Sequence, residues 1–358
     1  MTLPATRATA GSPAPTATAA ATPPLAPRNE WQRIVARYER TDPRRAVGQL
    51  ATTLLPLGAL FYLMYYSLAW PYWATLLLAI PTAAFLVRTF IIMHDCAHRS
   101  FLPSARANDA VGMITGVITM TPFSRWRSEH AKHHASSGDL ERRGHGDIPT
   151  LTVREYLART PWQRFRYRLF RHPLVLIGLG PLHMMVLQRL HPDRARLTDR
   201  ASVSVWSTNA ALAAVFAAFA IWLGVLEVLL IYLPAMYLAG AAGVWLFYVQ
   251  HQYEDTYWRE HQDWDYATAA IRGSSYFRLP AALRWVTGSI GLHHVHHLGP
   301  RIPNYHLKRC HDENAMFHDV TTLTLLESAR TLRLALWDEA DGRLVRFSDV
   351  RPLARRAG

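Results

Sequence analysis

The stretches His94-Asp95-Cys96-Ala97-His98, His130-Ala131-Lys132-His133-His134 and His293-His294-Val295-His296-His297 decide what this chain is. Each cluster follows or lies near a long apolar stretch. Residues three and four apart share a face of a helix, so H-x-x-x-H and H-x-x-H-H each direct two or three imidazoles at one point. Imidazole binds iron, zinc, copper and nickel. Three such sets supply more nitrogen than one tetrahedral zinc ion uses, which predicts a pair of metals with several histidines each.

Apolar residues make up 50% of the 358 residues. They gather in runs of roughly twenty, the length that crosses the hydrocarbon core of a bilayer. Four runs are long enough to span: residues 47–69, 72–93, 204–223 and 225–249. Short turns join the first run to the second and the third to the fourth. The sequence therefore predicts an all-α integral membrane protein with four transmembrane helices in two hairpins, capped by a cytoplasmic helical domain that carries the histidine site.

The distribution of Lys and Arg predicts the orientation. Both hairpin turns lack these residues, whereas the segment before the first span, the segment between the hairpins and the C-terminal region are rich in Arg. The positive-inside bias then places both termini and the middle segment in the cytoplasm. All three histidine clusters fall on that same side, so they can share one site. The net charge of +13 fits contact with anionic headgroups, and no nucleic acid is needed to explain it.

Lesser features of the pattern give further expectations. Residues 110–120 are too short to span and are expected to form a re-entrant or interfacial helix, and residues 174–190 are expected to be interfacial. Arginines alternate with aromatic residues over 162–171, a pattern typical of a helix in the headgroup plane. Arg88, inside the second span, is expected to snorkel to the inner interface. Leucines at helical spacing over 323–337 predict a helix that packs on the cap.

The chain divides into three parts. Residues 1–29 are rich in Ala, Thr and Pro, lack the apolar core of a secretory signal, and are expected to be a disordered cytosolic tail. Residues 30–320 carry the spans and clusters, and residues 321–358 are expected to form a C-terminal cytoplasmic helix and tail. Cys96 and Cys310 are the only cysteines, too few for a disulfide framework or a four-thiolate iron site.

The three histidine boxes, spaced around two hairpins, resemble those of the membrane-bound fatty acid desaturases over roughly residues 47–318. Residues 133–142, 248–251 and 302–305 resemble the omega-6 (Δ12) acyl-lipid branch in particular. The resemblance implies a non-haem di-iron centre that uses O₂ to introduce a cis double bond into an acyl chain of a membrane lipid.

The resemblance also implies nine histidine ligands for the two irons. Eight belong to the boxes: His94, His98, His130, His133, His134, His293, His296 and His297. The ninth is His251, which follows the fourth span. His294 fills a variable slot of the third box and is expected to point away from the metals. The histidines outside the boxes receive no metal role: His145, His172, His183, His191, His261, His306, His311 and His318.

A ligand imidazole needs a partner at its other nitrogen. Five carboxylates near the boxes or the fourth span are candidates: Asp95, Glu129, Asp139, Glu141 and Asp255. For each of them the alternative is an ordinary solvated carboxylate on the cytoplasmic face.

An external electron donor is implied by the stoichiometry of the reaction. Reduction of O₂ to water takes four electrons, and the acyl chain supplies two. The chain shows no C-x-x-C pair, no G-x-G-x-x-G motif and no fused haem domain, so a separate ferredoxin-like or cytochrome-like carrier is expected. The arginine-rich face could dock an acidic carrier or contact only lipid headgroups. The frequency of Arg and Ala over Lys favours a bacterial protein of the inner membrane.

Two alternatives remain open at this level. The same site would serve a fatty acyl hydroxylase or another di-iron acyl-modifying oxidase, because outcome depends on a few pocket residues. A histidine-rich metal transporter is more distant. It would need ionisable residues along the spans, which here carry almost none besides Arg88.

Overall fold

The computed structural model describes residues 28–144, 148–190 and 200–350. The tail predicted for residues 1–29 lies outside the described residues except for its last two, which begin helix α1 (Arg28–Ala36). Residues 351–358, His145 and His191 also lie outside them. The described chain is mostly helical, as predicted.

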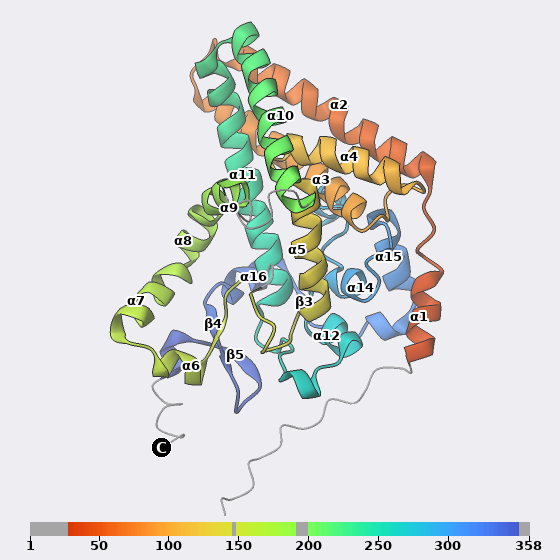
Figure 1. Cartoon of the computed structure of the whole chain (residues 1–358), viewed down its shortest axis with the longest axis vertical. Coiled ribbons are helices and arrows are strands. Elements are labelled where there is room, and N and C mark those ends of the chain that lie inside the picture. Colours follow the sequence, from red (N-terminus) through yellow and green to blue (C-terminus); the bar gives the residue numbers. More distant parts are fainter. Residues whose placement is uncertain (1–27, 145–147, 191–199, 351–358) are drawn as a thin grey trace, which may run out of the picture.

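Four long helices match the four predicted spans: α2 (Pro43–Ser67), α3 (Trp73–Ala97), α10 (Arg200–Leu223) and α11 (Val225–His251). Each is long and apolar enough to cross a membrane. They form two antiparallel hairpins whose turns lie together at one end of the molecule, with the cap at the other end (Figure 1). The chain is therefore an integral membrane protein with the predicted two-hairpin arrangement.

Helix α3 of the first hairpin packs side by side with helix α11 of the second. Small residues at their contact, among them Ala79, Ala83, Ala235 and Ala239, belong to one buried cluster. Small side chains let two helix backbones approach closely in a membrane. Because both helices run toward the cap, the end of α3 and the end of α11 arrive at the same place.

Local chemistry sets where the spans begin. Asp42 accepts hydrogen bonds from the backbone N–H groups of Arg44 and Arg45 at 3.0 and 3.2 Å, and Pro43 occupies the first turn of α2. Gly224 connects α10 to α11 with φ 102° and ψ 146°, a conformation open essentially to glycine alone. A Cβ at Gly224 would also collide with the carboxylate of Glu227.

Four further helices are each below spanning length. They are α4 (Ala105–Ile118), α7 (Pro161–Phe170), α8 (Pro173–Gly178) and α9 (Gly180–Leu190). Helices α8 and α9 pack against α11, and α4 packs against α3. Trp162 and Phe165 on α7 are exposed and stack on each other, so α7 presents an aromatic face outward.

The cap consists of short helices and two small sheets. Its remaining helices are α5 (Phe123–Ser136), α6 (Val153–Ala158), α12 (Tyr266–Arg272), α13 (Ala281–Val286), α14 (His293–Leu298), α15 (Asn304–Glu313) and α16 (Leu325–Thr331), with short 3₁₀ turns at His261–Asp263, Ala315–Phe317 and Phe347–Asp349. One sheet has the order β1 (Leu151–Thr152), β4 (Leu334–Asp338), β5 (Arg343–Arg346). The other pairs β2 (Tyr276–Phe277) with β3 (Thr322–Leu323) in parallel.

The helix predicted over residues 323–337 is wrong in its second half. Helix α16 ends at Thr331, and strand β4 follows it. All five residues of β4 are buried, because it pairs with β1 on one side and β5 on the other. The Asp341-Gly342 pair, with Gly342 at φ 62°, supplies the turn of the β4–β5 hairpin and is the sequence signal for it.

The snorkelling predicted for Arg88 is also wrong. Its side chain is buried, with Nε donating to Thr53 Oγ1 at 3.1 Å. The guanidinium lies 3.8 Å from the ring centroid of Trp285 and donates to the backbone carbonyl of that residue. Helix α13 therefore covers Arg88, and cation–π and hydrogen-bond contacts replace the expected contact with water.

The turn at Gly224 generates a stability prediction. Gly224→Ala is expected to lower the stability of the protein by about 1–3 kcal/mol, because alanine must adopt a strained backbone conformation there. The measurement is the apparent melting temperature of the purified protein in detergent. Gly243→Ala is the matched control, since a Cβ at this helical position of α11 meets no atom within 4 Å. Equal melting temperatures for the two variants would contradict the argument.

Candidate metal centre

Four elements bring the predicted histidines to the junction of the membrane helices and the cap. His94 lies in the last turn of α3 and His98 is its C-cap. His251 is the last residue of α11. The remaining six come from two cap helices: His130, His133 and His134 from α5, and His293, His296 and His297 from α14.

The nine imidazoles form two groups, and in each group the ligand nitrogens lie within 4.8 Å of one another. The five-histidine group consists of His94, His98, His130, His134 and His296. The four-histidine group consists of His133, His251, His293 and His297. The groups adjoin, because the rings of His134 and His297 stack with centroids 4.2 Å apart. The sequence alone does not divide the ligands in this way.

In the four-histidine group, the Nε2 atoms converge on one point. His251 Nε2 lies 2.9 Å from His293 Nε2 and 3.2 Å from His133 Nε2. His293 Nε2 lies 3.1 Å from His297 Nε2. All four side chains are buried.

In the five-histidine group, His134 Nε2 lies 3.1 Å from His130 Nε2 and 3.0 Å from His296 Nε2. The Nε2 atoms of His94 and His98 are buried and have no hydrogen-bond partner among the described residues. A buried polar nitrogen without a partner is costly, so these two atoms point to a ligand outside the polypeptide.

Contacts at the Nδ1 atom, on the far side of the ring from the converging nitrogens, fix the orientation of two of the imidazoles. His94 Nδ1 lies 3.1 Å from Asp95 Oδ1, and Asp95 Oδ2 accepts hydrogen bonds from the backbone and side-chain nitrogens of Asn304 at 2.7 and 2.8 Å. His251 Nδ1 donates to the carbonyl oxygen of Gly273 at 3.0 Å. A proton on Nδ1 leaves the lone pair on Nε2, which is the atom that faces the other histidines.

The electrostatics of the site favour neutral imidazoles. Burial, and to a smaller extent the neighbouring imidazoles, hold the pKa of His98, His130 and His134 well below the usual value. The same causes lower the pKa of His293, His296 and His297. The neutral form is the one that binds a metal ion.

The donor set fits metal ions. Metal–imidazole bonds are roughly 2.0–2.1 Å long, so two nitrogens at right angles on one metal lie roughly 3.0 Å apart. The closest contacts around His251, at 2.9 and 3.2 Å, have this spacing. Hydrogen bonding accounts for at most one of the two contacts, because His251 uses its one proton on Gly273 and its Nε2 atom has a single lone pair. Two groups of nitrogen lone pairs directed inward are what two cations require.

His294 lies outside both groups, as expected. Its Nε2 atom is 3.2 Å from Nδ1 of His311 on α15, away from the converging nitrogens. His311 in turn contacts His318, whose Nε2 is 2.9 Å from the His311 carbonyl oxygen. The contact between His294 and His311 joins α14 to α15 and explains the position of His294 without a metal.

The five carboxylates predicted to orient the ligand histidines have different surroundings in the structure. Asp95 contacts His94, as described above. Glu129 pairs with Lys132 at 2.8 Å. Asp139 is fully buried but pairs with His261 at 2.8 Å, and the backbone N–H of His261 also donates to Glu141 at 3.4 Å. Asp255 is exposed to solvent.

Sequence reasoning missed four residues at the site. Asn304 had a signal, since it lies in the Ile302–Tyr305 motif after the third box. The Gly273 carbonyl had none, because a backbone acceptor leaves no mark in the sequence. Trp126, one turn before His130, stacks on that ring with centroids 4.3 Å apart. Phe247, one turn before His251, packs against His133 and His251 at 5.2 and 5.3 Å.

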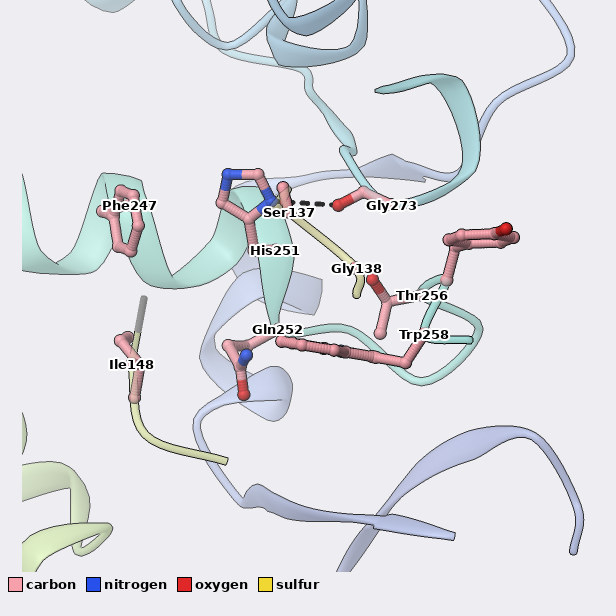
Figure 2. A pocket seen from close by; sticks show the side chains of 10 residues that line it. Ser137, Gly138, Ile148, Phe247, His251, Gln252, Thr256, Trp258 and Gly273 are labelled. Carbon is pink, nitrogen blue, oxygen red and sulfur yellow. Dashed lines mark hydrogen bonds between the residues drawn. The ribbon is translucent and has the colours of Figure 1, made fainter. Parts of the chain in front are cut away.

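A small pocket opens beside His251 (Figure 2). Phe247 and Ile148 form one wall of the pocket, and Gln252, Thr256 and Trp258 line another part of it. Figure 2 also shows the hydrogen bond from His251 to the Gly273 carbonyl. The four-histidine group therefore has an adjoining space with both apolar and polar walls.

Comparison with known proteins agrees with this geometry. A family model described as "Fatty acid desaturase" matches residues 67–320, which include all three boxes and His251. The chain is 41% identical to a fatty acid desaturase of Bacillus subtilis over 318 residues, 88% of this chain and 90% of that protein.

More distant relatives carry more specific names. The chain is 27% identical to the sn-1 oleoyl-lipid 12-desaturase of Synechocystis over 75% of this chain and 76% of that protein. It is 26% identical to the chloroplastic sn-2 acyl-lipid omega-3 desaturase (ferredoxin) of Arabidopsis thaliana over 61% of this chain and 50% of that protein.

The two neighbouring histidines of the third box should behave differently. His293→Ala removes one ligand of the four-histidine group and is expected to lower the metal content of the purified protein. His294→Ala removes the contacts with His311, Tyr276 and Phe317 but no nitrogen of either histidine group, and is expected to keep the metal content of the wild type. Metal per chain, measured by plasma mass spectrometry, distinguishes the two. The same loss in both variants would show that the third box is misassigned.

The pair formed by Asp95 and His94 gives a second prediction. Asp95→Asn is expected to weaken metal binding about 10–100-fold, the usual effect of removing the carboxylate that orients a ligand histidine. The measurement is metal retention against increasing chelator concentration. Glu129→Gln is the matched control, because the Glu129 carboxylate is half-exposed and pairs with Lys132. Identical chelator curves for Asp95→Asn and the wild type would refute the role of Asp95.

Proposed function

This chain belongs to the fatty acid desaturase family and is an oxidoreductase, and from that premise we propose that it introduces a cis double bond into the acyl chain of a membrane lipid, using O₂ and two non-haem irons. The single observation that carries the proposal is the convergence of nine imidazoles in two adjoining groups at the ends of the membrane helices. The chemistry of the site therefore supports the function, and the family match agrees with it.

The ligand assignment follows the two groups. We assign one iron to the five-histidine group and the other to the four-histidine group. When bound, the irons would supply the O₂-dependent chemistry that removes hydrogen from an unactivated methylene, which no amino-acid side chain achieves. An all-nitrogen, neutral donor set differs from the carboxylate-rich sites of soluble di-iron bundles.

The polypeptide contributes position and exclusion of water. Asp95 and the Gly273 carbonyl hold His94 and His251 with their Nε2 atoms directed inward. Burial of the four-histidine group keeps solvent away from the reacting region. The acyl chain must be held with one methylene beside the metal groups, because placement of the reacting atoms is the main contribution that a protein makes to such a reaction.

A lipid-linked acyl chain is the proposed substrate. The metal groups lie at the ends of the apolar helices α3 and α11, so we place them at the edge of the bilayer, where an acyl chain would reach them from the membrane. The names of the Synechocystis and Arabidopsis relatives specify acyl lipids. The motif details favour the omega-6 (Δ12) branch, but identities of 27% and 26% to a 12-desaturase and an omega-3 desaturase do not separate these positions.

A separate carrier would supply two electrons per double bond. We propose a ferredoxin-like or cytochrome-like protein for this role, because the substrate provides half of the four electrons that O₂ takes up. One relative has ferredoxin in its name. The arginine-rich cap offers positive charge to an acidic carrier.

The orientation and location extend the same argument. The two hairpin turns contain no Lys or Arg, whereas the cap is rich in Arg. We therefore place the cap, both termini and the metal groups in the cytoplasm, and the protein in a bacterial inner membrane. The similarity to the Bacillus subtilis protein supports a bacterial membrane.

The family assignment bears differently on the two alternative functions, a metal transporter and another acyl-modifying oxidase. A histidine-rich metal transporter is excluded by the family assignment. A hydroxylase or another acyl-modifying oxidase would use the same metal groups, so the product decides between it and a desaturase.

Lipid analysis after expression in a bacterial host tests the function. The wild type is expected to yield fatty acids with one additional cis double bond, located by mass spectrometry. His133→Ala is expected to abolish this product because the four-histidine group loses a ligand, whereas His183→Ala, an exposed histidine outside the boxes, is expected to retain it. A hydroxylated product from the wild type, or full activity in His133→Ala, would overturn the proposal.

A further inference from the structure

Arg171 is a buried arginine whose role nothing so far explains. It is the C-cap of α7 and is only 2% exposed. Within the described residues, no carboxylate lies within ion-pair distance of it. Burying a guanidinium without a counter-ion is expensive, so the surrounding groups must compensate for the lost hydration.

The compensation comes from five neutral acceptors on three separate parts of the chain. Nη2 of Arg171 donates to Gln252 Oε1 at 2.8 Å and to Tyr248 Oη at 3.1 Å, both at the end of α11. Nη2 also donates to the carbonyl oxygen of Leu334 in β4 at 2.8 Å. Nη1 donates to the Pro149 carbonyl at 3.1 Å and to Thr150 Oγ1 at 3.2 Å.

The end of α11 is also a favourable electrostatic partner. The C-terminal end of a helix carries partial negative charge, which stabilises a nearby cation. Arg171 lies over the Tyr248 ring, with the guanidinium carbon 5.5 Å from the ring centroid. The Tyr248 hydroxyl donates to the same Leu334 carbonyl at 2.5 Å, so α11, β4 and Arg171 are joined at one point.

The two contacts on α11 flank a candidate ligand. Tyr248 lies one turn before His251, and Gln252 follows it directly as the C-cap of the helix. The backbone N–H of Gln252 donates to the Tyr248 carbonyl at 2.8 Å, so the two Arg171 contacts lie in one closed helical turn with His251 between them. Gln252 also lines the pocket beside His251 (Figure 2). The position of His251 therefore depends on groups that Arg171 holds.

We infer that Arg171 is a positioning residue for the four-histidine group: it fixes the last turn of α11 and, through that turn, the place of His251. His251 is the one member of its group that no histidine box supplies: the Gly273 carbonyl orients its ring, and Arg171 holds the helix turn that carries it. The inference rests on the proposed function, because it takes the nine histidines as ligands of two metals.

Metal stoichiometry of full-length variants tests the inference. Arg171→Met is expected to lower iron from about two per chain to about one, because loss of an orienting contact weakens the four-histidine group while the five-histidine group keeps its ligands. Arg171→Lys, which restores a cation, is expected to recover part of the second iron. Arg168→Met is the matched control, since Arg168 is on the same helix but bonds to Tyr156 Oη on α6.

The outcomes separate the two proposals. Two irons in Arg171→Met, or equal loss of both irons, would overturn the positioning role, and fewer than two irons in the wild type would instead contradict the proposed function. If Arg171→Met does not fold, Tyr248→Phe and Gln252→Ala replace it, each removing one acceptor. Each is expected to weaken retention of one of the two irons against chelator. Wild-type retention in both variants would also overturn the role.

Discussion

The convergence of nine buried nitrogen lone pairs is the constraint on which the rest of the structure depends. Neutral imidazoles about 3 Å apart gain little from one another when their protons are committed elsewhere, as the His251 proton is to Gly273. The arrangement becomes favourable when cations occupy the two points toward which the nitrogens are directed, since each metal–nitrogen contact replaces lost hydration. Folding and metal binding are therefore coupled in this region.

The fold satisfies this constraint by ending helices at the site. Helices α3 and α11 pack through small residues, so His94 and His251 reach the same point from within the membrane layer. The cap supplies α5 and α14, each with histidines on one face. The contacts of Arg171 then link the end of α11 to strand β4, which lies beyond the residues that match the family.

Much of this arrangement follows from the sequence, because the strongest signals are periodic. Apolar runs of membrane length predicted the four spans. Histidines three and four residues apart predicted helices that place their imidazoles on one face. The division into five and four ligands did not follow, because it depends on how α5 lies between α3 and α14. His133 and His134 are adjacent in sequence, yet they belong to different groups. Arg88 was misjudged for a related reason, since Trp285, which covers it, lies far along the chain. Strand β4 was misjudged although the Asp341-Gly342 turn that follows it is visible in the sequence.

The central claim is that each chain holds two irons in nitrogen-rich sites formed by these groups. Mössbauer spectroscopy of the wild type, enriched with ⁵⁷Fe and combined with quantification of iron per chain, tests it most directly. We predict about two irons per chain and two iron environments of similar intensity, one for the five-histidine group and one for the four-histidine group. A single iron per chain, or zinc without iron, would contradict the account.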